Sequence, residues 1–334
     1  MAGTPQTAAD RPDPATDVFL AHRNLLFTVA YEMLGSAADA EDVLQETWLR
    51  WAGVDLGVVR DQRAYLVRIT TRQALGRLRT LGRRKESYFG PWLPEPLLTA
   101  PDVAEDVALA DSVSMAMLMV LETLAPTERA VFVLREVFDL GYDEIAEAVD
   151  KTPAAVRQIA HRARAHVAAR RPRQVVSAAE TRGALDAFRR AVETGDLQGL
   201  LDILAPDVVL LGDGGGVKQA VPRPILGADK VARLLAAGWS KVPSVTSWRT
   251  TQVNGHPALI LHLDGELDTR VPQLVVKRSS ESGRRAAKID VCLRKGVCLR
   301  SIAGVWSWLA RVEGGDPGWR LDGKCLVDGL VFGS

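Results

Sequence analysis

The sequence predicts a multidomain protein in which two all-α domains precede an α+β domain. Apolar residues recur about every 3.6 positions through two long stretches, from Asp17 to about Arg84 and from Asp102 to Arg171. The segment between them, YFGPWLPEPLLTAP at 88–101, has four prolines and three aromatic residues and cannot continue a helix. From about Ser177, helical segments give way to the strand-like runs DVVLL, ALILHLDGEL and QLVVK. Helices followed by several strands indicate an α+β domain.

The composition sets limits on the function. The chain has 334 residues, enough for two or three domains, and its 42 Lys and Arg nearly balance its 41 Asp and Glu. Nucleic-acid binding would therefore need a local concentration of positive charge. No apolar run is long enough to span a bilayer, and residues 1–16 are expected to be a flexible lead rather than a signal peptide. Cys292, Cys298 and Cys325 have no metal-ligand spacing, so we expect a cytoplasmic protein without metal, cofactor or disulfides.

The first helical domain is expected over residues 17–86 as three helices. Gly35 is suited to end the first helix, and Ser36 to cap the second. The second helix has acidic residues in its first turns and a buried stripe that includes Trp48 and Trp51. The third, DQRAYLVRITTRQALGRLRTLGRRK, is strongly basic, although a basic run taken alone is more often solvated surface.

The second helical domain, expected over residues 111–173, contains a helix-turn-helix in GYDEIAEAVDKTPAAVRQIAHRARAHVAARR. Its first helix has apolar residues at i, i+3, i+4 and i+7 from Tyr142, and residues 150–152 form the turn. Thr152 is a good N-cap, and Pro153 fits the first helical position. The second helix of such a motif enters the major groove of DNA.

Charge on this motif is polarised. Residues 151–173 contain seven basic side chains and no acid, whereas the preceding helix is acidic. Arginine can bind guanine with two hydrogen bonds, and glutamine can bind adenine in the same way. A solvated basic face is the simpler explanation for a basic helix alone, but the capped turn and the acid-free span together favour DNA. The residues expected to face DNA are Thr152, Arg157, Gln158, His161, Arg162 and Arg164.

Four segments in order then resemble a known family. DAEDVLQETWLRW, AYLVRITTRQALGRLR, LAPTERAVFVLREVFDLGYDEIAEAV and AAVRQIAHRARAHV are similar to bacterial sigma factors of the extracytoplasmic-function (ECF) type, in the sigma-70 family. The resemblance covers about residues 17–171. It implies a sigma domain 2 at 17–86 and a sigma domain 4 at 111–173. It also implies a non-enzymatic protein that binds core RNA polymerase and promoter DNA to start transcription.

The resemblance also implies roles for individual positions. The second helix would dock on the coiled coil of the largest polymerase subunit through Asp39, Asp42, Gln45, Glu46 and Trp48. The third helix would contact the −10 element through Arg68, Thr71, Arg72, Arg77 and Arg79. The helix from Pro153 would read the −35 element. Many relatives have an Asp after the AL pair where this chain has Gly76, so we expect a locally weakened helix there.

The linker resembles that of one large group of these sigma factors, which have a GPWLPEP linker and a fused SnoaL-like domain of the nuclear-transport-factor-2 type. The linker is expected at 87–110 and the SnoaL-like cone at 177–269. The resemblance implies that the cone contacts the sigma domains and the linker and regulates activity within one chain. Core packing explains Trp92 about as well as a regulatory role. The linker motif consists of Gly90, Pro91, Trp92, Leu93, Pro94, Glu95 and Pro96.

Other interpretations of the C-terminal part stay open. Some SnoaL-like relatives are enzymes, which makes Asp207, Asp213, His256, His262 and Asp264 candidates for a minor catalytic hypothesis. A weaker form of this hypothesis is that the cone binds an unknown small ligand without catalysis. After Thr269 the resemblance fades, and we expect 270–334 to be a diverged tail that leaves the cone without its closing strands, unless it is a genuine extension.

The main alternative function is a one-component helix-turn-helix regulator whose C-terminal domain binds an effector. The DAEDVLQETW and RITTRQALGRL segments argue against this alternative, because a repressor needs neither of them.

Overall fold

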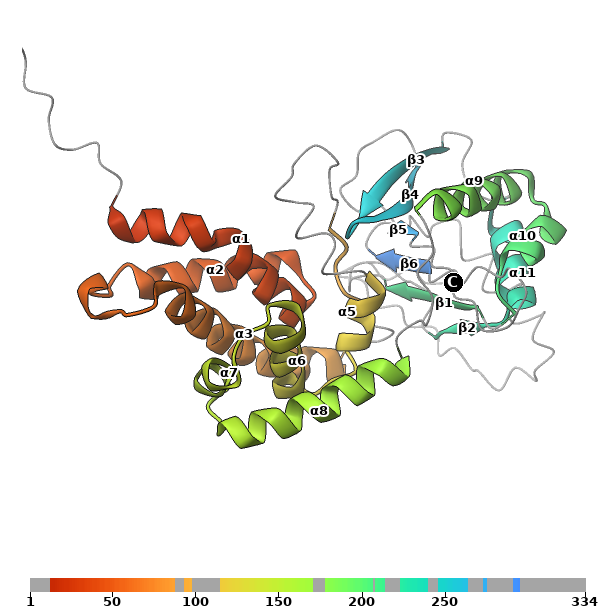
Figure 1. Ribbon diagram of the computed structural model, residues 1–334. Coiled ribbons are helices and arrows are strands. Elements are labelled where there is room, and N and C mark those ends of the chain that lie inside the picture. Colours follow the sequence, from red (N-terminus) through yellow and green to blue (C-terminus); the bar gives the residue numbers. More distant parts are fainter. Residues whose placement is uncertain are drawn as a thin grey trace, which may run out of the picture.

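The helices of the two N-terminal domains lie beside the part of the chain that contains all of the described strands (Figure 1). The structure is a computed structural model that describes residues 13–87, 93–97, 115–170, 178–206, 208–213, 223–239, 246–263, 273–274 and 291–294. The first domain consists of α1 (Pro14–Leu34), α2 (Ala37–Trp51) and α3 (Gln62–Ser87), with a short 3-10 turn, η1, at Leu56–Val58. These three helices pack against one another.

Local sequence signals set the helix ends of this domain, as predicted. Gly35 ends α1 in the left-handed region, with φ 69°, and its N–H donates to the Tyr31 carbonyl over 2.7 Å. The Ser36 hydroxyl then accepts from the Asp39 N–H at the start of α2. Trp51 at the end of α2 is fully buried, and its indole N–H donates to the Ala15 carbonyl over 2.8 Å.

The second domain contains the expected helix-turn-helix. It consists of α5 (Met115–Leu121), α6 (Pro126–Phe132), a π-helical turn η2 (Val133–Val137), α7 (Tyr142–Val149) and α8 (Pro153–Arg170). Asp150 turns the chain with φ 55°, and the Thr152 hydroxyl accepts from the Ala155 N–H over 3.2 Å. Since α8 starts at Pro153, the predicted turn and N-cap are both confirmed.

A continuous apolar core joins the two helical domains. It runs from α1–α3 through Leu93 of the linker to Leu134 of η2 and Ile145 of α7. A buried arginine, Arg129 of α6, ties α6 to α1. It donates to the Glu32 carbonyl over 2.8 Å and pairs with Glu122 at 2.6 Å. The domains therefore contact each other closely, with α3 packed against α6 and α7.

The C-terminal part is α+β, as expected. Its helices are α9 (Ala178–Thr194), α10 (Leu197–Ile203) and α11 (Ala228–Trp239). One sheet has the order β2 (Ile225–Leu226), β1 (Val209–Asp213), β6 (Val291–Arg294), and the other has the order β3 (Thr246–Val253), β4 (His256–Leu263), β5 (Gln273–Leu274). A second apolar cluster, which includes Phe188, Leu200 and Val231, lies between the helices and the strands.

Two strands come from the segment that was expected to be a diverged tail. β6 pairs in parallel with β1, from Leu210 opposite Val291 to Asp213 opposite Arg294, and β5 pairs antiparallel with β4. The prediction that this segment supplies no closing strands is therefore wrong for β5 and β6. Both strands extend the sheets through backbone pairing. Residues 295–334, with Cys298 and Cys325, lie outside the described residues.

Candidate nucleic-acid interface

The helix-turn-helix presents a polar face on α8. Val156, Ala160 and Ala163 are buried, which turns the intervening positions outward. The exposed residues on that outer face are Thr152, Arg157, Gln158, His161, Arg162 and Arg164. The side chains predicted to read DNA thus share one accessible side of the second helix.

Contacts within the domain distinguish these side chains. Arg164 donates from Nε to Glu136 over 2.7 Å and from Nη2 to the Tyr142 hydroxyl over 2.9 Å. The hydrogen bond with Glu136, followed by that with Tyr142, raises the pKa of Arg164 above its ordinary value. The Arg157 guanidinium lies 5.4 Å from the Tyr142 ring centre. Arg164 therefore ties α8 to η2 and α7, whereas Gln158 and His161 extend from the exposed face.

The five side chains of α3 predicted at the −10 element fall into four groups, one of which is Arg77 alone. Thr71 is fully buried, so its predicted contact with DNA is not available in this conformation. Arg79 is exposed and makes no ion pair with a described residue. Arg68 and Arg72 contact α7 instead: Arg68 lies 3.1 Å from the Glu147 carboxylate, and Arg72 donates to the Glu147 carbonyl over 2.8 Å.

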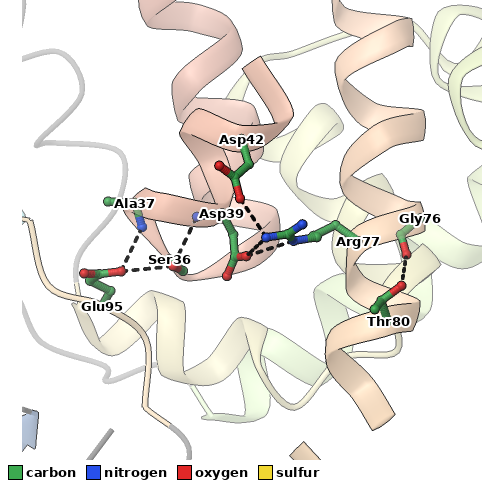
Figure 2. Close-up of polar contacts among 8 residues, drawn as sticks. All are labelled: Ser36, Ala37, Asp39, Asp42, Gly76, Arg77, Thr80 and Glu95. Atoms are coloured by element: carbon green, nitrogen blue, oxygen red, sulfur yellow. Dashed lines mark hydrogen bonds and ion pairs between the residues drawn. The ribbon is translucent and has the colours of Figure 1, made fainter. Parts of the chain in front are cut away.

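Arg77 is engaged by the acidic residues of α2 (Figure 2). Its guanidinium donates twice to Asp39, over 2.8 and 2.6 Å, and once to Asp42 over 2.8 Å. The hydrogen bond to Asp39 raises the pKa of Arg77, and the charge of Asp42 adds to the increase. The resemblance placed Arg77 at DNA and the two acids at the polymerase, yet the structure joins all three. Arg77 therefore positions the acidic end of α2.

The remaining residues predicted to bind polymerase line α2. Gln45 and Glu46 are exposed one turn beyond Asp42. Trp48 is half-buried, and its ring centre lies 5.2 Å from that of Phe19. Trp48 thus supports the packing of α2 on α1, and the accessible part of the predicted docking surface is polar.

The linker binds the start of α2. Leu93 is buried in the common core, and Glu95 accepts hydrogen bonds from the Ser36 hydroxyl over 3.0 Å and the Ala37 N–H over 3.2 Å (Figure 2). The Glu95 N–H donates to the Gly35 carbonyl over 2.6 Å. A carboxylate is favoured at a helix N-terminus, so Glu95 acts as a second cap on α2. Gly90, Pro91 and Trp92 of the linker motif lie outside the described residues.

Asn254 connects the C-terminal domain to this linker. It occupies the turn between β3 and β4, has φ 49° and is 2% exposed. Its side-chain Oδ1 accepts from the Leu97 N–H over 2.9 Å, and its own N–H donates to the Leu97 carbonyl over 2.9 Å. Its Nδ2 donates to the Tyr31 hydroxyl of α1 over 3.1 Å, and that hydroxyl donates to the Glu95 carbonyl. One side chain thus joins the hairpin, the linker and the first domain.

No sequence pattern indicated that Glu147 contacts α3 or that Asn254 contacts the linker. The Asn-Gly pair at 254–255 is a hairpin signal, but nothing local indicates that its side chain reaches the linker. Of the catalytic candidates, Asp207 and Asp264 lie outside the described residues, His256 is exposed, and Asp213 and His262 lie in β1 and β4. Within the described ranges, no group of three His, Cys, Asp or Glu residues is placed to hold a metal ion.

Comparison with known proteins places these domains in a family. The Sigma-70 region 2 model matches residues 18–84, which span α1 to α3, and the Sigma-70, region 4 model matches residues 114–167, which span α5 to most of α8. The chain is 38% identical over 222 residues to the ECF RNA polymerase sigma factor SigJ of Mycobacterium tuberculosis, covering 65% of this chain and 70% of the relative. The chain belongs to the ECF sigma factors.

Two further similarities extend beyond the sigma domains. This sigma factor resembles the crystal structure of the M. tuberculosis ECF sigma factor SigJ with a TM-score of 0.64 and 31% identity, over 84% of this chain and 96% of that one. It is also 33% identical over 258 residues to the probable ECF RNA polymerase sigma factor SigI of the same species, covering 76% of this chain and 87% of the relative. The predicted order of two helical sigma domains and an α+β, SnoaL-like domain is confirmed.

Membership of this family sets the function class. The protein is a promoter-recognition factor that works with core RNA polymerase at promoter DNA, and sigma factors are initiation factors rather than enzymes. The alternative of a one-component regulator leaves the sigma region 2 match unexplained. Among the helices that the structure describes, none is long and apolar enough to cross a membrane.

Proposed function

We propose that this sigma factor reads a promoter with two helices and that its C-terminal domain controls it through the linker. For the −35 element, the support is the exposed polar face of α8. Arg157, Gln158 and Arg162 have the residue types that bind guanine, adenine and phosphate. The N-cap at Thr152 fixes the start of the helix that would enter the major groove.

For the −10 element, the proposed surface is the basic side of α3, where α7 contacts Arg68 and Arg72 in this conformation. Arg68, Arg72 and Arg79 provide positive charge on it, and Tyr65 lies beside Arg68, with 4.8 Å from the guanidinium to the ring centre. Arginines beside an aromatic ring suit single-stranded DNA, whose bases stack while its phosphates pair with the cations. Arg77 and Thr71 are not part of this proposed surface, because one is held by α2 and the other is buried.

For polymerase binding, the proposed surface is the acidic side of α2. Asp42, Gln45 and Glu46 are exposed there, and Arg77 fixes the first of them. A preorganised acidic surface favours a basic partner, because the side chains lose less freedom when they bind. A protein with this role acts on cellular DNA, so we also propose that it is cytoplasmic. Because its role is that of an initiation factor, we further propose that it has no catalytic activity.

One observation carries the regulatory part of the proposal. Asn254 of the C-terminal hairpin binds the linker at Leu97, and the linker carboxylate of Glu95 caps the helix that would dock on the polymerase. The C-terminal domain is therefore linked by successive hydrogen bonds to the start of α2. A change in the hairpin would alter the cap, and the cap would alter the presentation of Asp39 and Asp42.

The test is run-off transcription with purified core polymerase. Asn254→Gly keeps the left-handed turn, because glycine adopts positive φ freely, and removes both side-chain hydrogen bonds. Tyr31→Phe is the matched variant, because it removes the hydroxyl that bonds Asn254 Nδ2 and the Glu95 carbonyl but leaves both bonds between Asn254 and Leu97 in place. We expect Asn254→Gly to change the transcript yield more than Tyr31→Phe does. Equal yields from wild type and both variants would contradict control through this junction.

A further inference from the structure

We propose that Glu147 of α7 competes with DNA for Arg68 and Arg72 of α3 and thereby favours a closed sigma factor. The inference rests on the proposed −10 role of α3. It adds a regulatory contact between the two sigma domains, separate from the contact between the C-terminal domain and the linker.

The contact places two oxygens of one residue against two arginines. The Glu147 carboxylate lies 3.1 Å from Nη1 of Arg68, and the Glu147 carbonyl accepts from Nη2 of Arg72 over 2.8 Å. Arg68 and Arg72 are four positions apart on one face of α3, where a phosphodiester would meet both. The carbonyl belongs to the last turn of α7, where the helix carries partial negative charge. Glu147 thus offers these arginines the charge and the acceptors that a DNA phosphate offers.

The closed arrangement is incompatible with reading both promoter elements at once. The −10 and −35 elements are named for positions about 25 base pairs apart, roughly 85 Å of B-form duplex. In the structure, α3 and α7 are in side-chain contact, and a common apolar core joins the domains. The domains must separate before α3 and α8 can reach their two elements. Separation breaks both contacts of Glu147 and frees Arg68 and Arg72 together.

The closed form engages two arginines of α3 and leaves the polar face of α8 exposed. Arg157, Gln158 and His161 on α8 stay exposed, whereas Arg68 and Arg72 are engaged. The Arg68 and Glu147 side chains are 32% and 69% exposed, so water and salt weaken their ion pair. Glu147 therefore shifts the balance between closed and open forms without locking it, and DNA or polymerase can displace it.

The test compares two charge reversals on the same helix. Glu147→Lys puts an ammonium beside the Arg68 guanidinium, while Asp143→Lys makes the same change in net charge at an exposed position in the first turn of α7. Each full-length protein is titrated against a fluorescein-labelled single-stranded dT20 probe, with binding read by anisotropy at low salt. We expect Glu147→Lys to bind about two- to fivefold more tightly than Asp143→Lys, the range set by the weakness of exposed ion pairs.

A second pair of proteins identifies the arginines as the cause. Adding Arg68→Gln and Arg72→Gln to both charge reversals should abolish the difference between them. If Glu147→Lys melts early in a thermal scan, Glu147→Gln replaces it, because it removes the charge without adding another. We expect Glu147→Gln to bind dT20 more tightly than wild type, by a smaller factor. Equal affinity of the two Lys variants, or a difference that survives without the arginines, would overturn the proposal. Run-off transcription by the wild type tests the proposed function independently, since its absence would contradict that function whatever the dT20 result.

Discussion

The Arg77 contact gives the sharpest prediction, because the sequence and the structure assign this residue different roles. Arg77 bonds Asp39 and Asp42, with side-chain exposures of 32% for Arg77, 15% for Asp39 and 55% for Asp42. A buried hydrogen bond to a charged group contributes roughly 1.5–3 kcal/mol to the free energy of unfolding, but partial exposure reduces this contribution. We expect Arg77→Ala to lower the free energy of unfolding by about 1–2 kcal/mol.

The functional consequence should appear in polymerase binding. Without Arg77, Asp39 and Asp42 repel each other and sample more conformations, so the affinity for core polymerase should fall. Arg77→Lys should recover only part of it, because an ammonium cannot reproduce the planar fork of hydrogen bonds to two carboxylates. Since the pKa of Arg77 is raised, its charge persists below that pKa, and the effect should be constant between about pH 6 and pH 9.

Arg79→Ala is the matched control, because Arg79 is exposed two positions further along α3. It should weaken opening of promoter DNA while leaving the affinity for core polymerase unchanged. The measurements are chemical denaturation and binding of labelled sigma factor to core enzyme. If Arg77→Ala keeps wild-type polymerase affinity and loses only promoter opening, Arg77 contacts DNA and the positioning role is refuted.

Four further substitutions test other features of the protein. Gly76→Ala should raise the free energy of unfolding by about 0.5–1 kcal/mol, because α3 is unbroken there and an added Cβ meets nothing within 4 Å; a lower denaturation midpoint would contradict this. Arg157→Ala and Arg162→Ala should each weaken binding to the −35 element by about 1–3 kcal/mol. Transcription from a promoter with that element should fall, and transcription from a promoter without it should not. Arg164→Ala should lower the thermal midpoint of the protein more than Arg157→Ala or Arg162→Ala does, because it loses its bonds to Glu136 and Tyr142, and an unchanged midpoint would argue against that tie.

The features that sequence reasoning found are those with local causes. The caps at Ser36 and Thr152, the left-handed end at Gly35 and the exposed face of α8 depend on residues within one or two turns. Residue spacing alone reveals them, because helix periodicity and cap chemistry act over short distances. The resemblance to sigma factors then gave the order of the domains.

The features that it missed depend on residues far apart in the chain. Glu147 is 79 positions from Arg68, and Asn254 is 157 positions from Leu97, so no local pattern could pair them. Thr71 illustrates a different limit. The family motif suggested a role at DNA, but only the packing of α3 determines that its side chain is buried. The basic run of α3 likewise gave no sign that Arg77 is held by α2 while Arg79 is exposed.

The most direct test of the central claim is run-off transcription from genomic promoter fragments with purified core RNA polymerase and the full-length protein. We expect transcripts from defined start sites that require the protein and that diminish with Arg157→Ala and Arg79→Ala, which act on separate promoter elements. If the protein neither binds core polymerase nor directs it to any start site, the account is wrong.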